Sequence, residues 1–287
     1  MNPETPDRPQ DAATCAKLRL HRDARGSQQG DALPQGALLR AVRANLTYAF
    51  QPIVNIHTGG VYGYEALLRG LEGLGFSSAY ELFSYALEQG LAGELDFALR
   101  ELAIKRFARL TESVRYRLFF NIDPRLVAQE RPSETLALLA AYGLPPEAIC
   151  LELSEHADLT ATPEVGKLIA AYRRHGFPLA IDDFGTGYAG LRLLYEHPPD
   201  LLKIDRFFVK GIADDHRKRL FVSNTVQLAH VMGIGVIAEG VETDREMLAC
   251  KEGGCDLVQG YLVARPQLSV EVLLPSYEHI AAINLNN

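Results

Sequence analysis

Eight short apolar runs recur along the 287-residue chain, and their repetition constrains the fold more than any other feature. Segments in which apolar residues recur at helical spacing separate most of the runs, as between Leu95 and Leu110. The runs cover residues 47–54, 61–69, 116–122, 149–155, 178–184, 200–205, 234–241 and 256–264. Alternating strands and helices predict a mostly parallel sheet, and eight strands favour a closed (β/α)₈ barrel of the α/β class over an open sheet.

The first two runs are too close together to be parallel neighbours. Six residues, including Thr58-Gly59-Gly60, separate them. A crossover between parallel strands needs a dozen residues or more, whereas a short glycine-containing connection forms a hairpin. We therefore expect the barrel to carry one antiparallel strand at its start.

Residue composition and hydrophobic periodicity divide the chain into three parts. Residues 1–36 are rich in Pro, Asp, Arg, Gln and Gly and show no sustained period, so we expect a disordered N-terminal tail. Residues 37–275 read as one globular domain, and residues 276–287 as a C-terminal tail. A capping-box pattern from Thr243 to Glu246 predicts a helix start within that domain.

The net charge and the lengths of the apolar runs argue against two kinds of partner, duplex DNA and membranes. The 29 basic and 36 acidic residues give a net charge of −7, which argues against binding to duplex DNA. No apolar run approaches the roughly 18 residues that a membrane helix needs, and the N-terminus lacks the apolar segment of a secretory signal. The scattered cysteines indicate neither a disulfide framework nor a zinc knuckle, so we expect a reduced cytoplasmic protein without a membrane partner.

Polar residues interrupt seven of the runs near their carboxyl ends, where strands buried on both faces should be apolar. In a (β/α)₈ barrel the carboxyl ends of the strands meet at one mouth, which is where active sites form. These residues are Glu65, Asn121, Glu152, Asp182, Asp183, Lys203, Glu239 and Gln259. The pattern predicts that they share one site.

The composition of this set indicates a metal site. Five carboxylates face a single lysine, and like charges in one pocket cannot all ionise unless cations compensate them. Oxygen ligands without His or Cys suit Mg²⁺ or Mn²⁺. The adjacent Asp182 and Asp183 are suited to bridging two ions, the usual arrangement for phosphodiester cleavage.

The same residues belong to seven motifs that follow one another between residues 43 and 270: YEALLR, FFNIDP, LELSE, DDFGTGY, KID, EGVET and QGY. Together they resemble the EAL-domain cyclic di-GMP phosphodiesterases of bacteria. The resemblance implies a modified TIM barrel with one antiparallel strand across residues 37–275. It also implies metal-dependent hydrolysis of cyclic di-GMP to linear 5′-pGpG, which lowers this second messenger, with two Mg²⁺ or Mn²⁺ ions as cofactors.

The resemblance carries over residue by residue. The matched metal ligands are Glu65, Asn121, Glu152, Asp182, Asp183 and Glu239, with Asp182 shared between the ions. Lys203 matches the residue that contacts the attacking water, so Lys203, Glu239 and Glu65 are the expected catalytic residues. Gln51, Arg69 and Gln259 match positions at the substrate, and Glu155 and Glu242 match carboxylates that support loops. A homodimer is expected from the family, and a protein regulator is a further expected partner.

Departures from the family pattern leave every ligand position intact. Ser154 replaces a usual Thr, Asp123 a commoner Ser, and Ala189-Gly190 a usual Ser-Ser in the loop that couples the site to the dimer interface. The last of these changes bears on regulation more than on chemistry.

Other functions remain as alternatives. A G-x-G-x-x-G pattern over residues 185–190 matches the form of a dinucleotide fingerprint, but the two preceding aspartates would repel a pyrophosphate. The main alternative is a catalytically weak or inactive receptor that binds cyclic di-GMP or acts through a protein partner. Loss of Glu65, Asp182, Asp183 or Lys203 would favour that receptor, and all four are present.

Overall fold

The computed structural model describes residues 36–110, 113–123, 125–126, 132–155, 163–187 and 190–283. Residues 1–35 of the tail predicted over residues 1–36, and Ala189, lie outside the described residues. The chain forms two compact units, residues 1–48 with 68–105 and residues 49–67 with 106–287.

The first unit is mostly helical in the part that the structure describes. It contains α2 (Ala37–Asn45), the 3₁₀ turn η2 (Leu71–Leu74), α3 (Ala79–Glu88) and most of α4 (Ala92–Phe107). Helix α3 begins where the Ser78 side chain accepts a hydrogen bond from the backbone N–H of Glu81, which supplies one of the missing partners of a helix start. The helical spacing noted from Leu95 onward lies on α4, where Leu95 and Leu99 are buried.

The second unit is built on a closed barrel of eight strands, each paired with the next in chain order. The strands are β1 (Thr47–Asn55), β2 (Val61–Arg69), β3 (Arg117–Asn121), β4 (Ile149–Ser154), β5 (Leu179–Phe184), β6 (Leu201–Ile204), β7 (Gly235–Ala238) and β8 (Leu257–Val258). From β2 to β8 the neighbours are parallel, while β1 is antiparallel to β8. The barrel and its antiparallel first strand are confirmed.

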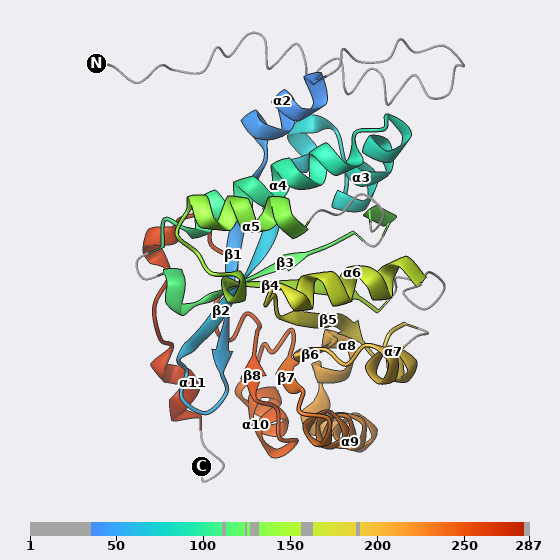
Figure 1. The fold of residues 1–287 in the computed structure, drawn as a ribbon. Coiled ribbons are helices and arrows are strands. Elements are labelled where there is room, and N and C mark those ends of the chain that lie inside the picture. The colour runs from blue at the N-terminus through green and yellow to red at the C-terminus, as the bar shows by residue number, and fades with distance from the viewer. Residues whose placement is uncertain are drawn as a thin grey trace. The chain divides into compact units, whose positions relative to one another are not determined.

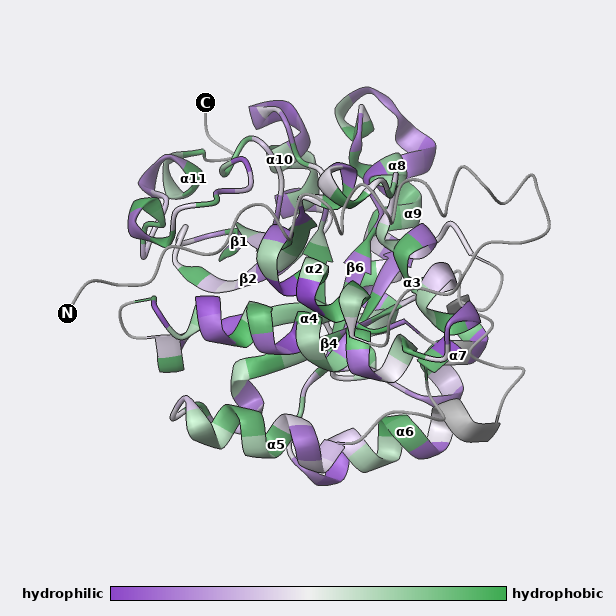
Figure 2. Ribbon diagram, turned by 90° about the horizontal axis from the view of Figure 1, so that it is seen from above, coloured by the Kyte–Doolittle hydropathy of each residue, from purple (hydrophilic) through white to green (hydrophobic). Residues whose placement is uncertain are grey.

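Helices follow the later strands and lie around the outside of the barrel (Figure 1). They are α5 (Pro132–Ala141), α6 (Pro163–Arg174), α7 (Gly190–Glu196), α8 (Arg206–Val209), α9 (His216–Val231), α10 (Asp244–Glu252) and α11 (Glu278–Ala282). The connections also contain the 3₁₀ turns η3 (Ser113–Arg115), η5 (Pro146–Ala148), η6 (Ile212–Asp214) and η7 (Val270–Val272). Hydrophobic and hydrophilic residues alternate along α6, as expected of a helix with one buried face (Figure 2). The predicted capping box is present at the start of α10.

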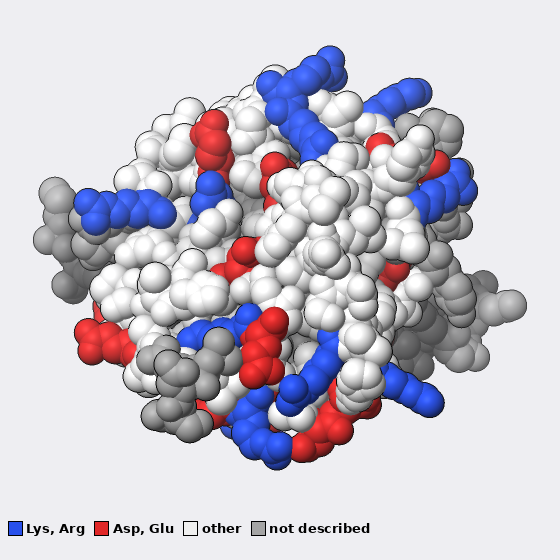
Figure 3. All heavy atoms as spheres, turned by 90° about the horizontal axis from the view of Figure 1, so that it is seen from below, with Lys and Arg blue, Asp and Glu red and all other residues white. Residues whose placement is uncertain are grey.

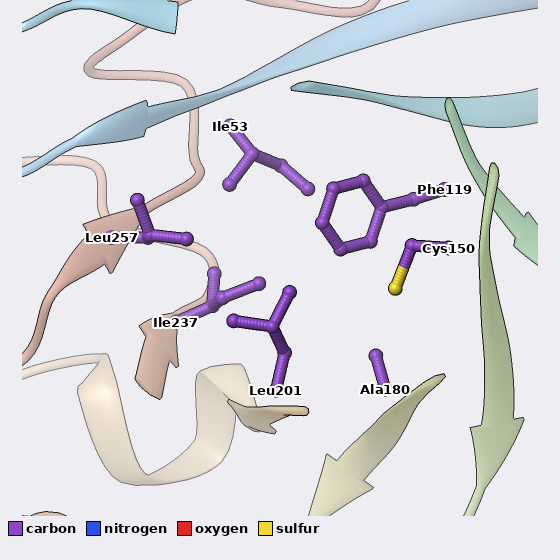
Figure 4. Close-up of a cluster of buried hydrophobic side chains, with 7 residues drawn as sticks. All are labelled: Ile53, Phe119, Cys150, Ala180, Leu201, Ile237 and Leu257. Carbon is purple, nitrogen blue, oxygen red and sulfur yellow. The ribbon is translucent and has the colours of Figure 1, made fainter. Parts of the chain in front are cut away.

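One buried residue from each of seven strands fills the barrel interior, and their side chains point toward one another (Figure 4). The cluster consists of Ile53, Phe119, Cys150, Ala180, Leu201, Ile237 and Leu257. Tyr62 of β2 packs against it. This layer closes the barrel and forms the floor above which polar side chains at the strand ends can gather.

Strand β8 is shorter than the predicted run over residues 256–264. The backbone turns at Gly260, whose carbonyl oxygen accepts hydrogen bonds from the N–H groups of Val263 and Ala264 at 3.1 Å each. Apolar composition alone did not reveal this turn, because it depends on contacts between Gly260 and the segment after β7.

No described helix is long and apolar enough to cross a bilayer. On the face shown in Figure 3, acidic and basic side chains are interspersed among uncharged residues. Residues 276–283 include α11, whose Ile280 is fully buried.

Candidate active site

The two-residue period of the strands places the polar residues above the core layer. Side chains two positions apart on a strand point to the same side, so a residue two positions beyond a core residue lies one layer nearer the barrel mouth. In the parallel strands this relation links Phe119 to Asn121, Cys150 to Glu152, Ala180 to Asp182, Leu201 to Lys203, Ile237 to Glu239 and Leu257 to Gln259. In antiparallel β1 it runs backward, from Ile53 to Gln51.

Lys203 lies at the centre of this layer. Its side chain is fully buried on β6, and its ammonium lies at ion-pair distance from four carboxylates. Lys203 Nζ is 2.6 Å from Glu152 Oε1, 2.9 Å from Asp182 Oδ1, 2.9 Å from Glu239 Oε1 and 3.7 Å from Glu65 Oε2. The structure therefore brings together five of the residues singled out from the sequence.

The crowding changes the acid–base properties of these groups. Burial raises the pKa values of the Glu152 and Glu239 carboxyls well above the ordinary value for glutamate. The neighbouring carboxylates raise these pKa values further, and Lys203 partly offsets the rise. Burial alone would lower the pKa of the Lys203 ammonium. The four carboxylates, Asp182 foremost, outweigh burial and hold the pKa of Lys203 well above its usual range.

The carboxylate oxygens form two overlapping groups that could each hold a cation. One group consists of Glu65, Glu152 and Asp182, and the other of Asp182, Asp183 and Glu239, with ligand atoms within 4.8 Å of one another in each. Asp182 belongs to both groups, as a residue shared between two ions must. The donor set, all oxygen, suits Mg²⁺ or Mn²⁺.

Two buried acceptors support this assignment. Among the described residues, Glu152 Oε1 and Gln259 Oε1 are buried and accept no hydrogen bond of good geometry, although Glu152 Oε1 is close to Lys203. Buried acceptors in native proteins are normally paired with a donor, a water or an ion. Asn121 Nδ2 donates to the other oxygen of Glu152 at 3.1 Å, which places the Asn121 side chain beside the same carboxylate. The residues present thus fit divalent cations.

A local irregularity in β5 brings two adjacent aspartates to one site. Neighbouring residues on a regular strand point to opposite faces. Here the register between β5 and β6 shifts between Ile181 and Phe184, and Asp183 has a φ of 57°, in the left-handed region. This bulge re-aims the Asp183 carboxylate, so Asp182 and Asp183 both face the same candidate ion.

The loop after Asp183 is tied to a neighbouring strand end. Glu155 Oε2 accepts hydrogen bonds from the backbone N–H groups of Gly185 and Gly187 at 2.7 and 2.9 Å. Ser154 Oγ lies 3.4 Å from Asp183 Oδ2, so the serine found in place of threonine keeps its hydroxyl at the aspartate. This is the geometry expected of the loop-supporting role predicted for Glu155.

A chain of amide side chains supports Glu65. Gln259 Nε2 donates to Glu65 Oε2 at 2.6 Å and to Gln51 Oε1 at 3.2 Å, while Gln51 Nε2 donates to the carbonyl oxygen of Ala264 at 3.1 Å. The bond to Ala264 fixes which end of the Gln51 amide faces Gln259. Gln259, one of the glutamines predicted at the substrate, therefore also holds the Glu65 carboxylate, and Gln51 supports Gln259.

We expect Gly260→Ala to disturb this chain. A β-carbon at residue 260 would clash with the backbone of Val241, so one of the two segments must shift, and Gln259 precedes the shifted residue directly. Overpacking of this kind costs about 1–3 kcal/mol of folding free energy. Urea unfolding would show that loss. Gly73→Ala is the control, because Gly73 also lacks a positive φ and a β-carbon there meets nothing within 4 Å. Unchanged stability of Gly260→Ala would contradict the close approach.

A cavity of about 260 Å³ opens beside the carboxylates. Gln51, Glu65, Glu239, Glu242 and Gln259 line it together with Arg206, Gly240, Gly260 and Tyr261. Glu242 Oε1 accepts a hydrogen bond from Arg206 Nη2 at 2.6 Å, so the predicted loop-supporting acid is held by an arginine. Sequence reasoning assigned no role to Arg206 or Tyr261, although Arg206 directly follows the KID motif and Tyr261 ends the QGY motif.

Arg69, a predicted substrate contact, does not belong to the unit that carries the carboxylates. It belongs to the first unit, where its exposed guanidinium donates to the carbonyl oxygen of Leu68 at 2.9 Å. Its contact with substrate stays a prediction.

Comparison with known proteins identifies the family. A model of the EAL domain matches residues 35–266. The chain belongs to the EAL-domain family. The seven motifs quoted from the sequence thus lie on an EAL barrel, and the polar layer around Lys203 is the carboxyl-end layer of that barrel.

Two relatives of known sequence are similar to this chain over most of its length. The cyclic di-GMP phosphodiesterase RocR of Pseudomonas aeruginosa is 33% identical over 223 residues, which cover 76% of this chain and 56% of RocR. A protein of Azorhizobium caulinodans is 36% identical over 234 residues, covering 77% of this chain and 31% of that protein. The chain thus spans less than two thirds of the length of these two relatives.

Solved EAL structures share the fold. A standalone EAL protein of Vibrio cholerae, in its c-di-GMP bound form, has a TM-score of 0.70 and 34% identity, over 78% of this chain and 92% of that chain. BlrP1 of Klebsiella pneumoniae, in complex with manganese and cyclic di-GMP, has a TM-score of 0.70 and 31% identity, over 78% of this chain and 56% of BlrP1.

Proposed function

We propose that this EAL protein is a metal-dependent phosphodiesterase that hydrolyses cyclic di-GMP to linear 5′-pGpG. The observation that carries the proposal is the pair of overlapping oxygen-ligand groups around Lys203, with Asp182 common to both. A receptor needs to bind the dinucleotide but has no need of two adjoining cation sites. The similar proteins that bind or cleave cyclic di-GMP support the same substrate for this chain.

Six residues would hold two ions, Mg²⁺ or Mn²⁺: Glu65, Asn121, Glu152, Asp182, Asp183 and Glu239. When bound, such ions stabilise negative charge on the phosphodiester and lower the pKa of a water molecule toward neutrality. The remaining chemistry falls to the protein's own side chains.

Lys203 and Glu239 have different parts in moving the proton. With its pKa held high, the Lys203 ammonium can donate a hydrogen bond to the attacking water but cannot accept its proton. The Glu239 carboxylate is the proposed proton acceptor, because it belongs to the group with Asp182 and Asp183 and its side chain remains 15% exposed beside the cavity. Water adds to phosphorus, the bond from phosphorus to the ribose 3′ oxygen breaks, and that oxygen leaves with a proton.

Substrate binding would use the cavity beside these groups. Gln51, Gln259 and Arg69 are the proposed substrate contacts, with Glu155 and Glu242 supporting the loops. We further propose a homodimer in the cytoplasm, a protein regulator, and an EAL domain over residues 37–275 between two tails.

The test is turnover of cyclic di-GMP by the purified protein with Mg²⁺ and, separately, Mn²⁺, with pGpG resolved by chromatography. We expect pGpG to form with either ion and not in EDTA. Glu65→Ala should remove turnover from a folded protein, because Glu65 belongs to one of the two ligand groups. Binding of cyclic di-GMP without cleavage by the metal-loaded wild type would instead establish the receptor.

We expect Mn²⁺ binding to release protons. The raised pKa values of Glu152 and Glu239 mean that these carboxyls hold protons at higher pH than ordinary glutamates, and a metal ion binds only the ionised form. Affinity for Mn²⁺ should therefore rise with pH above 4.5, the ordinary value. Calorimetric titration in buffers of different ionisation enthalpy measures the protons released. Proton-independent binding would show that the carboxylates are already ionised.

A further inference from the structure

Two aromatic rings outside the proposed ligand set lie directly against the loop that follows Asp183. Gly185 has a φ of 100°, and a β-carbon there would clash with Phe208 Cε2 and lie 3.0 Å from Phe221 Cζ. The rings of Phe208 and Phe221 are stacked, with centroids 3.8 Å apart and planes inclined by 15°. The backbone of Gly185 therefore rests on the Phe208–Phe221 stack.

The same short segment is held from β4 by Glu155. One carboxylate oxygen of Glu155 binds the N–H groups of Gly185 and Gly187. A β-carbon on Gly187 would lie 2.8 Å from the carbonyl oxygen of Glu155, so this contact is also close. The loop is thus held on one side by hydrogen bonds to Glu155 and on another by the rings of Phe208 and Phe221. We expect both sets of contacts to be needed.

The aromatic stack is itself anchored. Phe208 lies on the short helix α8, and Phe221 lies on the longer helix α9. Lys218 of α9 donates to the carbonyl oxygens of Phe207 and Lys210 at 2.5 and 2.6 Å, which ties α9 to α8. The Asp205 side chain caps α8, and Asp205 directly follows the β6 strand that carries Lys203. The rings therefore have fixed positions relative to the barrel.

The position of Gly185 affects Asp183 through the turn between them. The carbonyl oxygen of Asp183 accepts hydrogen bonds from the N–H and the hydroxyl of Thr186, at 3.3 and 2.7 Å. Asp183 also has the left-handed φ of 57°, a backbone conformation that needs support from its surroundings. Movement of Gly185 would let this turn relax and would move the Asp183 carboxylate away from Asp182 and Glu239.

We propose that Phe208 and Phe221 are positioning residues that hold Asp183 in the second ligand group. The inference rests on the proposed metal site and concerns one half of it. Asp183 belongs to the group with Asp182 and Glu239 but not to the group with Glu65 and Glu152. Loss of the stack should therefore weaken one ion and spare the other.

The experiment measures Mn²⁺ binding by the full-length protein without substrate, using the electron paramagnetic resonance signal of free Mn²⁺. Phe221→Ala should weaken one of two binding events by about 10- to 100-fold, the range found when groups that orient metal ligands are removed. The other event should change less than about twofold. Phe221→Leu keeps an apolar side chain at this position without extending it toward Gly185, and it should weaken the affected event less than Phe221→Ala does. Phe208→Leu, a milder change, repeats the test if Phe221→Ala does not fold.

Phe207→Ala is the matched control. Its ring is 63% exposed and packs edge-on against Phe208, with centroids 5.1 Å apart. This variant should bind Mn²⁺ like the wild type. Wild-type titration curves for folded Phe221→Ala would overturn the proposal, and so would equal weakening of both events. Failure of the wild type to bind Mn²⁺ would instead contradict the proposed function, so the two failures are distinguishable.

Discussion

Asp182→Asn should abolish metal-dependent turnover of cyclic di-GMP while leaving the protein folded. Asp182 is the one described residue common to both ligand groups, so its replacement removes a charged ligand from each. Metal ions contribute several kcal/mol of transition-state stabilisation, and a loss of that size corresponds to a rate reduction of about a thousandfold or more. Asparagine keeps the size and shape of aspartate, which limits damage to packing.

Two measurements separate this effect from unfolding. Turnover with saturating Mn²⁺ reports the catalytic loss, and urea unfolding in EDTA reports stability. We expect the stability to change by less than about 1 kcal/mol, because the substitution removes one ion pair with Lys203 but also relieves repulsion among crowded carboxylates. Asp214→Asn removes a charge from an exposed pair with Arg245 and should alter neither quantity. Substantial Mn²⁺-dependent activity in Asp182→Asn would contradict the shared-ligand assignment.

Much of this site could be predicted because strand geometry converts sequence spacing into position. A polar residue two positions beyond a core residue must lie above the core layer, and Cys150–Glu152 and Leu201–Lys203 show this relation. The hairpin was equally accessible, because six residues cannot form a parallel crossover. In both cases the decisive information lies within a short stretch of chain.

The features that escaped prediction depend on contacts between distant segments. The end of β8 is set by Gly260 against Val241, and the Asp183 bulge is set by the register of β5 against β6. The local sequence DLVQGYLVA reads as a strand because each residue in it is compatible with one. The packing of Gly185 on Phe221 likewise has no local signal, since Phe221 lies on α9, the fifth element after β5.

Lys203→Met should destabilise the metal-free protein, and added Mn²⁺ should reverse much of the loss. The Lys203 ammonium is fully buried among four carboxylates, and removing it leaves their charges uncompensated. Breaking a buried ion pair from one side costs about 3–5 kcal/mol. Divalent cations offset the same negative charge, so the metal-bound variant should recover stability even though it lacks the hydrogen-bond donor proposed for catalysis. Its turnover should fall by about 10²- to 10³-fold.

The stability lost in Lys203→Met should depend on pH in a direction set by the pKa values of the carboxyls. Lys203 lowers the pKa of Glu152 and Glu239, so its removal should raise both values further. A carboxyl with a raised folded-state pKa favours the folded protein at low pH and loses that contribution as pH rises through the folded value. The stability lost in Lys203→Met, relative to wild type, should therefore grow as pH rises above 4.5, the ordinary value for glutamate. Urea unfolding in EDTA at about pH 6 and about pH 8 measures the trend.

Lys251→Met is the matched control for losing a lysine. Lys251 Nζ donates to the carbonyl oxygens of Ile280 and Ile283, the first at 3.3 Å, and these neutral acceptors do not titrate. Its stability loss should be similar at both pH values and should not respond to Mn²⁺. A Lys203→Met protein that is as stable as wild type in EDTA at about pH 8 would mean that the carboxylates are protonated there, as their raised pKa values permit. That result would remove the electrostatic reason for assigning Lys203 as the cation that compensates the carboxylates in the metal-free protein. Metal binding would then displace only the protons held by these carboxyls.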